Sequence, residues 1–196
     1  RDDVESRGLG DVYKRQLISK VGNVTDGLKR MSKLVISSVS GAAAGAGVSL
    51  AFSGDFVVCA DNAKFIMAFV NLGLVPDTGG TYLFVKSLGI QKAMELCVTG
   101  RPMKAQEAKD AGMVYDVVPA EELDDTVMKL AKKFANGPLL SYKNIKKQIY
   151  QAGLADYKKY LDECEIPTQR ECAASSDFIE GVKAFMEKRK AEFKGE

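Results

Sequence analysis

The chain has 196 residues, of which 46% are hydrophobic and 28% are charged, and its formal net charge at pH 7 is +2. This composition is typical of one soluble globular domain, and so small a net charge indicates no nucleic-acid partner. No hydrophobic run approaches the roughly 20 residues that a membrane-spanning helix requires, so we expect no membrane partner.

The chain contains no histidine, which excludes Ser–His and Cys–His catalysis within it. Proton transfer therefore falls to Asp, Glu, Lys, Tyr or Cys. The four cysteines (Cys59, Cys97, Cys164 and Cys172) form no CxxC pair, so we predict no metal site. We interpret them as reduced thiols of a cytoplasmic protein.

The first 16 residues, RDDVESRGLGDVYKRQ, differ from the rest of the chain. They are highly charged, lack hydrophobic periodicity and contain no signal-peptide core. The run DVYKRQ resembles the translation of a transposon adapter used in library preparation. We therefore expect residues 1–16 to be non-native and the native chain to be cut before residue 17; a natural polar extension is the alternative.

Strands and helices alternate in the next hundred residues, because β-branched runs predict strands and glycine turns predict helix starts. The predicted elements are a helix at residues 17–31, a strand at 33–39, a helix at 48–54, strands at 55–60 and 64–68, and a helix from the turn at 76–80 to about residue 87. Gly89 ends that last helix.

The remainder is mostly helical. The predicted elements are helices at residues 90–99 and 104–111, a strand at 113–118, and helices at 121–135, 139–151, 154–172 and 177–193. Ser175 or Ser176 caps the last helix. This order predicts an α/β core followed by an all-helical C-terminal region of a kind that often serves assembly.

Two glycine turns, at residues 41–47 and 76–80, carry the clearest functional signal. Glycines at a helix start expose backbone N–H groups that can hold an oxyanion. Asp77 is the one carboxylate placed to face the same ligand. The structural alternatives are that the glycines only permit close packing and that Asp77 only caps the following helix.

Four segments in series resemble the crotonase (enoyl-CoA hydratase/isomerase) superfamily. They read KLVISSVSGAAAGAGVSLAFSGD, AKFIMAFVNLGLVPDTGGT, TGRPMKAQEAKDAGMV and EGVKAFMEKRKAEF, and with their spacing they cover nearly everything from residue 33 onward. The resemblance implies a crotonase-type spiral of ββα units, with a partial core at residues 17–119 and a helical oligomerisation region at 120–196. It also implies an acyl-CoA substrate, no cofactor or metal, and a homotrimer or homohexamer.

The resemblance assigns one oxyanion donor to the N–H group of Ala46, between Gly45 and Gly47. The second donor normally comes from a loop well upstream of residue 33, so we expect the 196-residue chain to be inactive alone. Hydratases of this superfamily use two glutamates, and this sequence has Ser49 and Phe69 at the matching positions. Hydration by two glutamates is therefore disfavoured, and Phe69 would make its side of the pocket drier.

Asp77, in LGLVPDTGG, resembles the acid of the 1,2-epoxyphenylacetyl-CoA isomerase group, and Gly80 belongs to the same binding turn. One carboxylate suffices to move a proton between two carbons. The sequence thus predicts an acyl-CoA isomerase of fatty acid or phenylacetate metabolism that uses Asp77. The alternatives are a hydratase-like or a hydrolase- or dehalogenase-like crotonase, and a non-catalytic acyl-CoA-binding fragment. Lys188, Arg189 and Lys190 are interpreted as solvated charges rather than CoA ligands.

Overall fold

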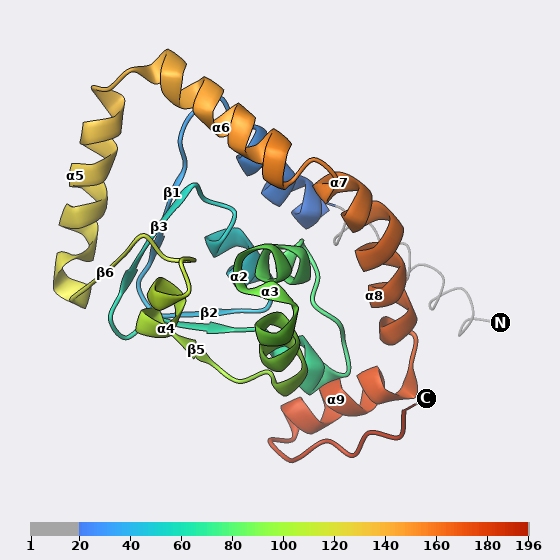
Figure 1. Cartoon of the computed structure of the whole chain (residues 1–196). Coiled ribbons are helices and arrows are strands. Elements are labelled where there is room, and N and C mark those ends of the chain that lie inside the picture. The colour runs from blue at the N-terminus through green and yellow to red at the C-terminus, as the bar shows by residue number, and fades with distance from the viewer. Residues whose placement is uncertain (1–19, 196) are drawn as a thin grey trace.

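The chain forms two small sheets with helices between and around them, as the computed structural model shows for residues 20–195 (Figure 1). The segment at residues 1–16 lies outside the described residues. The first sheet is parallel, in the order β1 (Ile36–Val39), β3 (Phe56–Ala60), β6 (Asp116–Val118). The second has the order β2 (Ala42–Ala44), β4 (Lys64–Ile66), β5 (Met103–Lys104), with β2 parallel and β5 antiparallel to β4.

A ββα unit is repeated along the chain. β1 lies in the first sheet and β2 in the second, and α2 (Ala46–Ala51) follows. β3 and β4 repeat this step, and the 3₁₀ helix η1 (Ala68–Leu72) and α3 (Gly80–Thr99) follow them. Ile36 pairs with Phe56 and Ala42 with Lys64, so successive units stack in register. The predicted spiral of ββα units is confirmed.

The core lies where α2 and α3 pack against the two sheets. Val48 of α2 is fully buried, and Phe52 stacks on Phe65 of β4 with ring centroids 4.6 Å apart. Phe84 of α3 meets Phe52 edge-on at 6.0 Å. The long α3 is bent at Gly89, whose φ of 76° and ψ of 168° are not helical, so the predicted break at this residue is confirmed.

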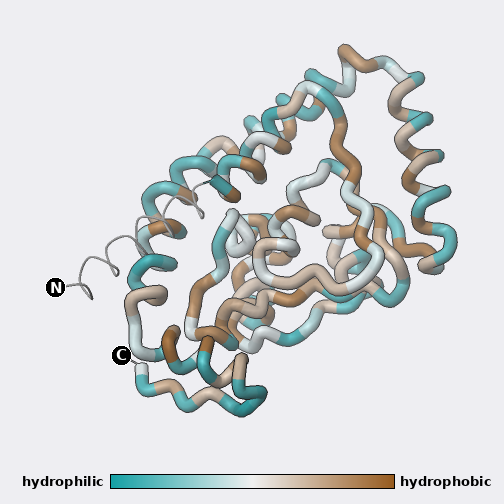
Figure 2. Tube along the Cα trace, turned by 180° about the vertical axis from the view of Figure 1, so that it is seen from behind, coloured by the Kyte–Doolittle hydropathy of each residue, from teal (hydrophilic) through white to brown (hydrophobic). Residues whose placement is uncertain are grey.

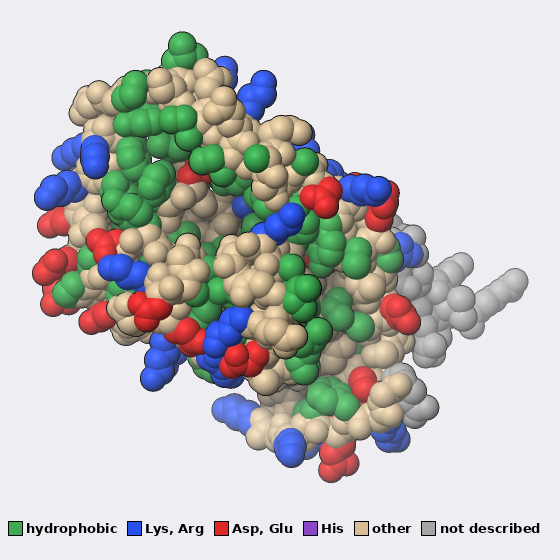
Figure 3. All heavy atoms as spheres, viewed as in Figure 1, with side chains coloured by type: hydrophobic (Ala, Val, Ile, Leu, Met, Phe, Trp, Pro, Cys, Tyr) green, Lys and Arg blue, Asp and Glu red, His purple; other side chains and the backbone are tan. Residues whose placement is uncertain are grey.

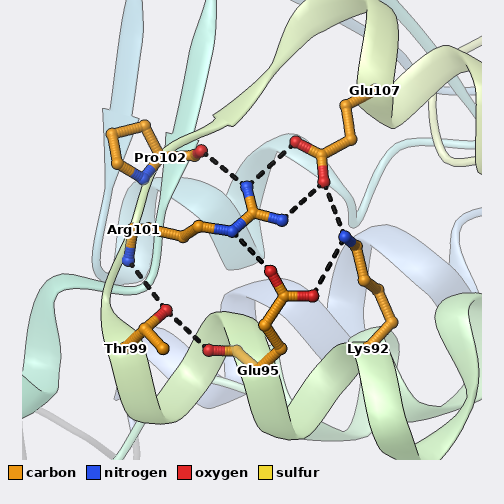
Figure 4. A network of polar contacts seen from close by, with 6 residues as sticks. All are labelled: Lys92, Glu95, Thr99, Arg101, Pro102 and Glu107. Carbon is orange, nitrogen blue, oxygen red and sulfur yellow. Dashed lines mark hydrogen bonds and ion pairs between the residues drawn. The ribbon is translucent and has the colours of Figure 1, made fainter.

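A network of ion pairs fixes the far end of α3 to α4 (Ala105–Asp110), as Figure 4 shows. The guanidinium of Arg101 donates to Glu107 at 2.7 and 3.0 Å and to Glu95 at 2.6 Å. Lys92 bridges the same two carboxylates at 3.0 and 2.8 Å. Hydrogen bonds from these cations lower the pKa of Glu107 to about 2. A network with bidentate geometry contributes more than isolated surface pairs.

The C-terminal helices surround this core. α5 (Leu123–Ala135) packs on the first sheet through Leu123 and Leu130. α6 (Leu139–Gly153), α7 (Tyr157–Tyr160), a π-helical turn (Leu161–Glu165) and α8 (Ile166–Ala173) then form an arc along one side, and α9 (Ser176–Met186) closes the chain beside η1 (Figure 1). Hydrophilic and hydrophobic residues alternate along the arc (Figure 2).

A buried ion pair holds the arc to the core. Lys146 of α6 lies 2.7 Å from Asp55, just before β3, and both side chains are less than one tenth exposed. Its ammonium also donates to the carbonyls of Leu28 and Lys33, at the end of a helix over residues 20–30. Three acceptors satisfy its three N–H groups, which is what a buried lysine requires.

Hydrophobic side chains gather on one face where α5 meets the start of α6 (Figure 3). A groove of about 380 Å³ lies there, lined by Leu34, Ile36, Val127, Phe134 and Leu139 among others. Within residues 20–195, no helix is both long enough and hydrophobic enough to span a bilayer.

Several predicted boundaries were wrong. Ala42–Ala44 forms β2, which was missed because alanine is a poor strand former and pairing with β4 overrides that preference. The strand at residues 64–68 stops at Ile66, and the helix at 154–172 is divided by the π-helical turn.

The last helix ends at Met186 rather than residue 193. Lys188 is left-handed with φ of 54°, and the tail then folds back on α9. There Asp177 accepts from the N–H groups of Lys194 and Gly195 at 2.6 and 2.9 Å. Ser175, one of the two predicted caps, accepts from the N–H of Phe178.

Candidate active site

The first glycine turn places the first backbone N–H groups of α2 at the start of that helix. Gly45 has a left-handed φ of 55° and donates to the carbonyl of Ile66 on β4 at 2.9 Å. This bond ties the turn to the second sheet. Ala46 and Gly47 are the first two helical residues, so their N–H groups have no acceptor within the helix. A helix start of this kind can hold a developing negative charge.

The positive φ of Gly45, rather than close packing, favours glycine at that position, and neither reason applies to Gly47. The ring of Phe69 lies against Gly45, where an added Cβ would come within 3.5 Å of Cζ, and Phe69 itself is only 9% exposed. A Cβ on Gly47 would meet no atom within 4 Å among the described residues. Gly47 thus borders open space beside the Ala46 N–H group, which a ligand can approach.

Ser49 joins this turn to Asp77. Its side chain is fully buried, and its Oγ donates to the backbone carbonyl of Asp77 at 3.1 Å. Gly80 is buried at the same contact, where a Cβ would lie 2.8 Å from Ser49 Oγ and 2.7 Å from Met67 Cε. Ser49 and Gly80 therefore hold two helix starts together.

The side chain of Asp77 does not cap α3. The N-cap residue is Gly79, which makes no side-chain capping bond. Asp77 Oδ2 accepts from Gln169 Nε2 at 3.4 Å, and the buried Oδ1 has no hydrogen-bond partner in residues 20–195. Burial raises the pKa of Asp77 to about 6, against the lowering effect of hydrogen bonds from Thr78 and Gln169. A half-buried carboxylate with one unused oxygen is suited to proton transfer.

Three residues of the C-terminal arc complete this turn, and no sequence motif predicted them. Glu165 accepts from the N–H of Gly79 with both oxygens, at 2.8 and 3.0 Å. Gln169 contacts both Val75 and Asp77, and the hydroxyl of Tyr157 lies 3.2 Å from the Thr78 carbonyl. One feature of the sequence could have indicated them: two polar residues lie on a helix face that is otherwise apolar and aromatic. The buried residues of that face follow one another at four-residue spacing: Tyr157, Leu161, Glu165 and Gln169.

The basic tail residue Arg189 is held by carboxylates. Its guanidinium pairs with Glu180 at 2.5 and 2.9 Å and with Glu187 at 2.7 Å. These pairs occupy all three guanidinium nitrogens, so Arg189 is not poised for a phosphate.

Comparisons with known proteins agree with this geometry. The family model described as "Enoyl-CoA hydratase/isomerase" matches residues 8–196. The chain is 38% identical over 194 residues to a trans-2-decenoyl-[acyl-carrier-protein] isomerase of Streptococcus mutans, covering 99% of this chain and 71% of that protein. It is 42% identical over 168 residues to a 1,2-epoxyphenylacetyl-CoA isomerase of Escherichia coli, covering 86% of this chain and 64% of that protein.

Among solved structures, an enoyl-CoA hydratase from Mycobacterium avium subsp. paratuberculosis superimposes with a TM-score of 0.86 at 30% identity. The match covers 91% of this chain and 72% of the other. The chain thus spans about two thirds of the length of these relatives.

Proposed function

Because the chain belongs to the enoyl-CoA hydratase/isomerase family, we propose that it isomerises an acyl thioester, with Asp77 as its only acid/base. The reaction is a double-bond shift in an enoyl-CoA or the ring isomerisation of 1,2-epoxyphenylacetyl-CoA. One observation carries the proposal: Asp77 Oδ1 is buried and has no hydrogen-bond partner among the described residues, on a turn that Ser49 bonds to the helix of Ala46.

For the double-bond shift, the described residues supply one base, Asp77, and one oxyanion donor, the N–H group of Ala46. The Asp77 carboxylate removes a proton from the carbon next to the thioester carbonyl of a 3-enoyl substrate. The electron pair moves onto the thioester oxygen, where the N–H of Ala46 stabilises the enolate. Asp77, now protonated, returns the proton to the fourth carbon, and the double bond forms between the second and third carbons. A pKa of about 6 leaves Asp77 ionised at neutral pH and still basic enough to accept a proton.

The residues around Asp77 disfavour the other chemistries of the family. Ser49 and Phe69 cannot act as general acids or bases near neutral pH, and both are buried. A second buried carboxyl group at this turn, that of Glu165, has both oxygens on the N–H of Gly79 and is not free to activate water. This arrangement supports an isomerase over a hydratase or a hydrolase.

We further propose assembly into a homotrimer or homohexamer in the cytoplasm. Support comes from hydrophobic side chains that the chain alone leaves in solvent: on α9, Ile179, Phe185 and Met186 are 68%, 75% and 77% exposed. Patches of this kind mark interfaces between subunits.

The function is tested with 3-decenoyl-CoA and the full-length gene product. An isomerase converts it to the conjugated 2-enoyl thioester, which absorbs in the ultraviolet. With 2-decenoyl-CoA in water, the enzyme forms no 3-hydroxy product at a comparable rate. Formation of that product as the faster reaction would assign the protein to the hydratases. If neither reaction occurs, 1,2-epoxyphenylacetyl-CoA is assayed as the second candidate substrate. If that compound is not converted either, the protein is a non-catalytic acyl-CoA binder.

A further inference from the structure

Glu165 is a buried carboxyl group that the proposed chemistry does not use. It lies at the end of the π-helical turn, 86 residues beyond Gly79 in the chain, and is 2% exposed. Burying a carboxyl group is unfavourable unless its hydrogen bonds are made inside the protein. Here both oxygens accept from one backbone N–H group, that of Gly79.

The turn that Glu165 holds is strained. Thr78 and Gly79 are both left-handed, with φ of 58° and 86°, and Thr78 is β-branched. A left-handed conformation is unfavourable for a residue with a side chain, so neighbouring contacts must hold it. Gly79 cannot be replaced, because a Cβ there would lie 1.8 Å from the hydroxyl of Tyr157.

Gln169 holds the same turn from one helical turn further along the arc. Its Oε1 accepts from the N–H of Val75 at 3.2 Å, and its Nε2 donates to Asp77 Oδ2 at 3.4 Å. Glu165 and Gln169 therefore hold the chain on both sides of Asp77. Within residues 20–195, this geometry leaves Asp77 Oδ1 as the carboxylate oxygen without a hydrogen-bond partner.

We propose that Glu165 is a positioning residue of this site: by accepting from Gly79, it fixes the left-handed turn and thereby the direction of the Asp77 carboxylate. The inference rests on the proposed function, since it concerns the same acid. It assigns to the C-terminal arc a part in catalysis besides assembly.

Glu165 does this as an uncharged acid at neutral pH. Burial raises the pKa of Glu165 to about 8, the hydrogen bond from Gly79 lowers it, and nearby Asp77 raises it. The other groups that face it are Tyr157 and Tyr160 of α7, together with Lys158 and Asp162, which line a small cavity beside it. An uncharged Glu165 adds no second negative charge beside the forming enolate.

Ionisation of Glu165 then lowers the rate at alkaline pH, because a buried negative charge opposes the charge on the thioester oxygen. The pH profile of kcat has an acid limb near 6 from Asp77 and an alkaline limb near 8 from Glu165. Lys29 also has a pKa lowered by burial to about 8 and lies over the ring of Tyr157. It needs its own control.

The experiment compares kcat against pH for the full-length gene product and four variants, with 3-decenoyl-CoA as the probe substrate. Glu165→Gln keeps an acceptor for Gly79 and cannot ionise, so it retains activity at neutral pH and loses the alkaline limb. Glu165→Ala loses kcat by about 100-fold, as expected when a reacting group is misplaced by about 1 Å. Glu163→Gln, exposed on the same turn, and Lys29→Arg, which stays charged, both keep the alkaline limb.

An alkaline limb that persists unchanged in Glu165→Gln overturns the inference, as does full activity of Glu165→Ala. If Glu165→Ala does not fold, the Glu165→Gln profile decides alone. Asp77→Asn, assayed beside these variants, separates the two proposals. Full activity of Asp77→Asn overturns the proposed function. If Asp77→Asn is inactive and Glu165→Gln keeps the same alkaline limb as the parent, only the positioning role is overturned.

Discussion

The Oγ of Ser49 donates a hydrogen bond to the backbone carbonyl of Asp77, 28 residues away, over 3.1 Å. Ser49 lies one helical turn after Ala46, whose N–H group is the proposed oxyanion donor. The contact therefore joins the two halves of the candidate site, the donor and the acid, through one buried hydroxyl group. Ser49 thus has a structural role at this site, through a bond to the backbone of the proposed acid.

Ser49→Ala removes that bond and leaves the Asp77 carbonyl without this donor. We expect the free energy of unfolding to fall by about 1 kcal/mol, the usual contribution of such a bond, and kcat to fall several-fold. Urea denaturation and the 3-decenoyl-CoA assay measure the two effects. Ser53→Ala is the matched control, because Ser53 is equally buried and bonds to the carbonyl of Ser49 instead. Equal losses of kcat in both variants would show that the Asp77 contact has no special role.

Two glycine variants distinguish a glycine that leaves space for the ligand, Gly47, from a glycine that is needed for close packing, Gly80. Gly80→Ala drives a methyl group into Ser49 and Met67, so its midpoint of thermal unfolding falls by several degrees. Gly47→Ala meets no atom of the described residues, and alanine favours a helix over glycine by about 1 kcal/mol, so stability holds or rises. Its kcat/KM nevertheless falls at least tenfold, because the methyl group occupies the space beside the Ala46 N–H. An unaltered kcat/KM in Gly47→Ala would show that the ligand does not occupy that space.

The stability of the fold decreases as pH rises from about 4 to about 8. Asp77 and Glu165 have ordinary pKa values of 3.8 and 4.5, and burial raises them to about 6 and about 8 in the folded chain. Between these values the folded state binds more protons than the unfolded state, so raising the pH favours unfolding. For Glu165 the effect is on the order of 5 kcal/mol, since the pKa rises from 4.5 to about 8 and one pKa unit corresponds to about 1.4 kcal/mol. Urea denaturation at both ends of this range measures it, and Glu165→Gln flattens the dependence; the same slope in that variant would contradict the assignment.

The hydrophobic face of α9 predicts an interface. Phe185→Asp places a charge on a side chain that is 75% exposed, so it lowers the assembled fraction without unfolding the chain. Analytical ultracentrifugation measures this fraction. Met128→Asp on α5, where the side chain is 54% exposed, serves as the control. Identical sedimentation of both variants and the parent would place the interface elsewhere.

The sequence predicted the parts of the fold and site that depend on local patterns. Hydrophobic periodicity predicted most of the helices, and Gly89 predicted the bend in α3. The glycine turns indicated Ala46 and Asp77 as candidate site residues. β2 could not be predicted in this way, because three alanines form a strand only when β4 lies alongside. The end of α9 at Met186 depends on the tail folding back to Asp177 and Glu180.

The partners of Asp77 were missed for a similar reason. Glu165 and Gln169 lie 86 and 92 residues from the groups that they contact. The helices that contain them have an ordinary amphipathic sequence pattern. No local spacing links them to the turn. Only the folded chain shows that Asp77, expected as a lone carboxylate, has a second buried carboxyl group on the adjacent helix.

The most direct test of the central claim is the isomerase rate of Asp77→Asn against that of the parent full-length protein, with Asp61→Asn on the exposed turn after β3 as the control. Asparagine keeps the shape and the contact with Gln169 but cannot accept the proton. We predict a loss of about 10²- to 10⁴-fold in kcat for Asp77→Asn, the usual range for a general acid/base, with no loss for Asp61→Asn. Equal rates for Asp77→Asn and the parent would contradict the account.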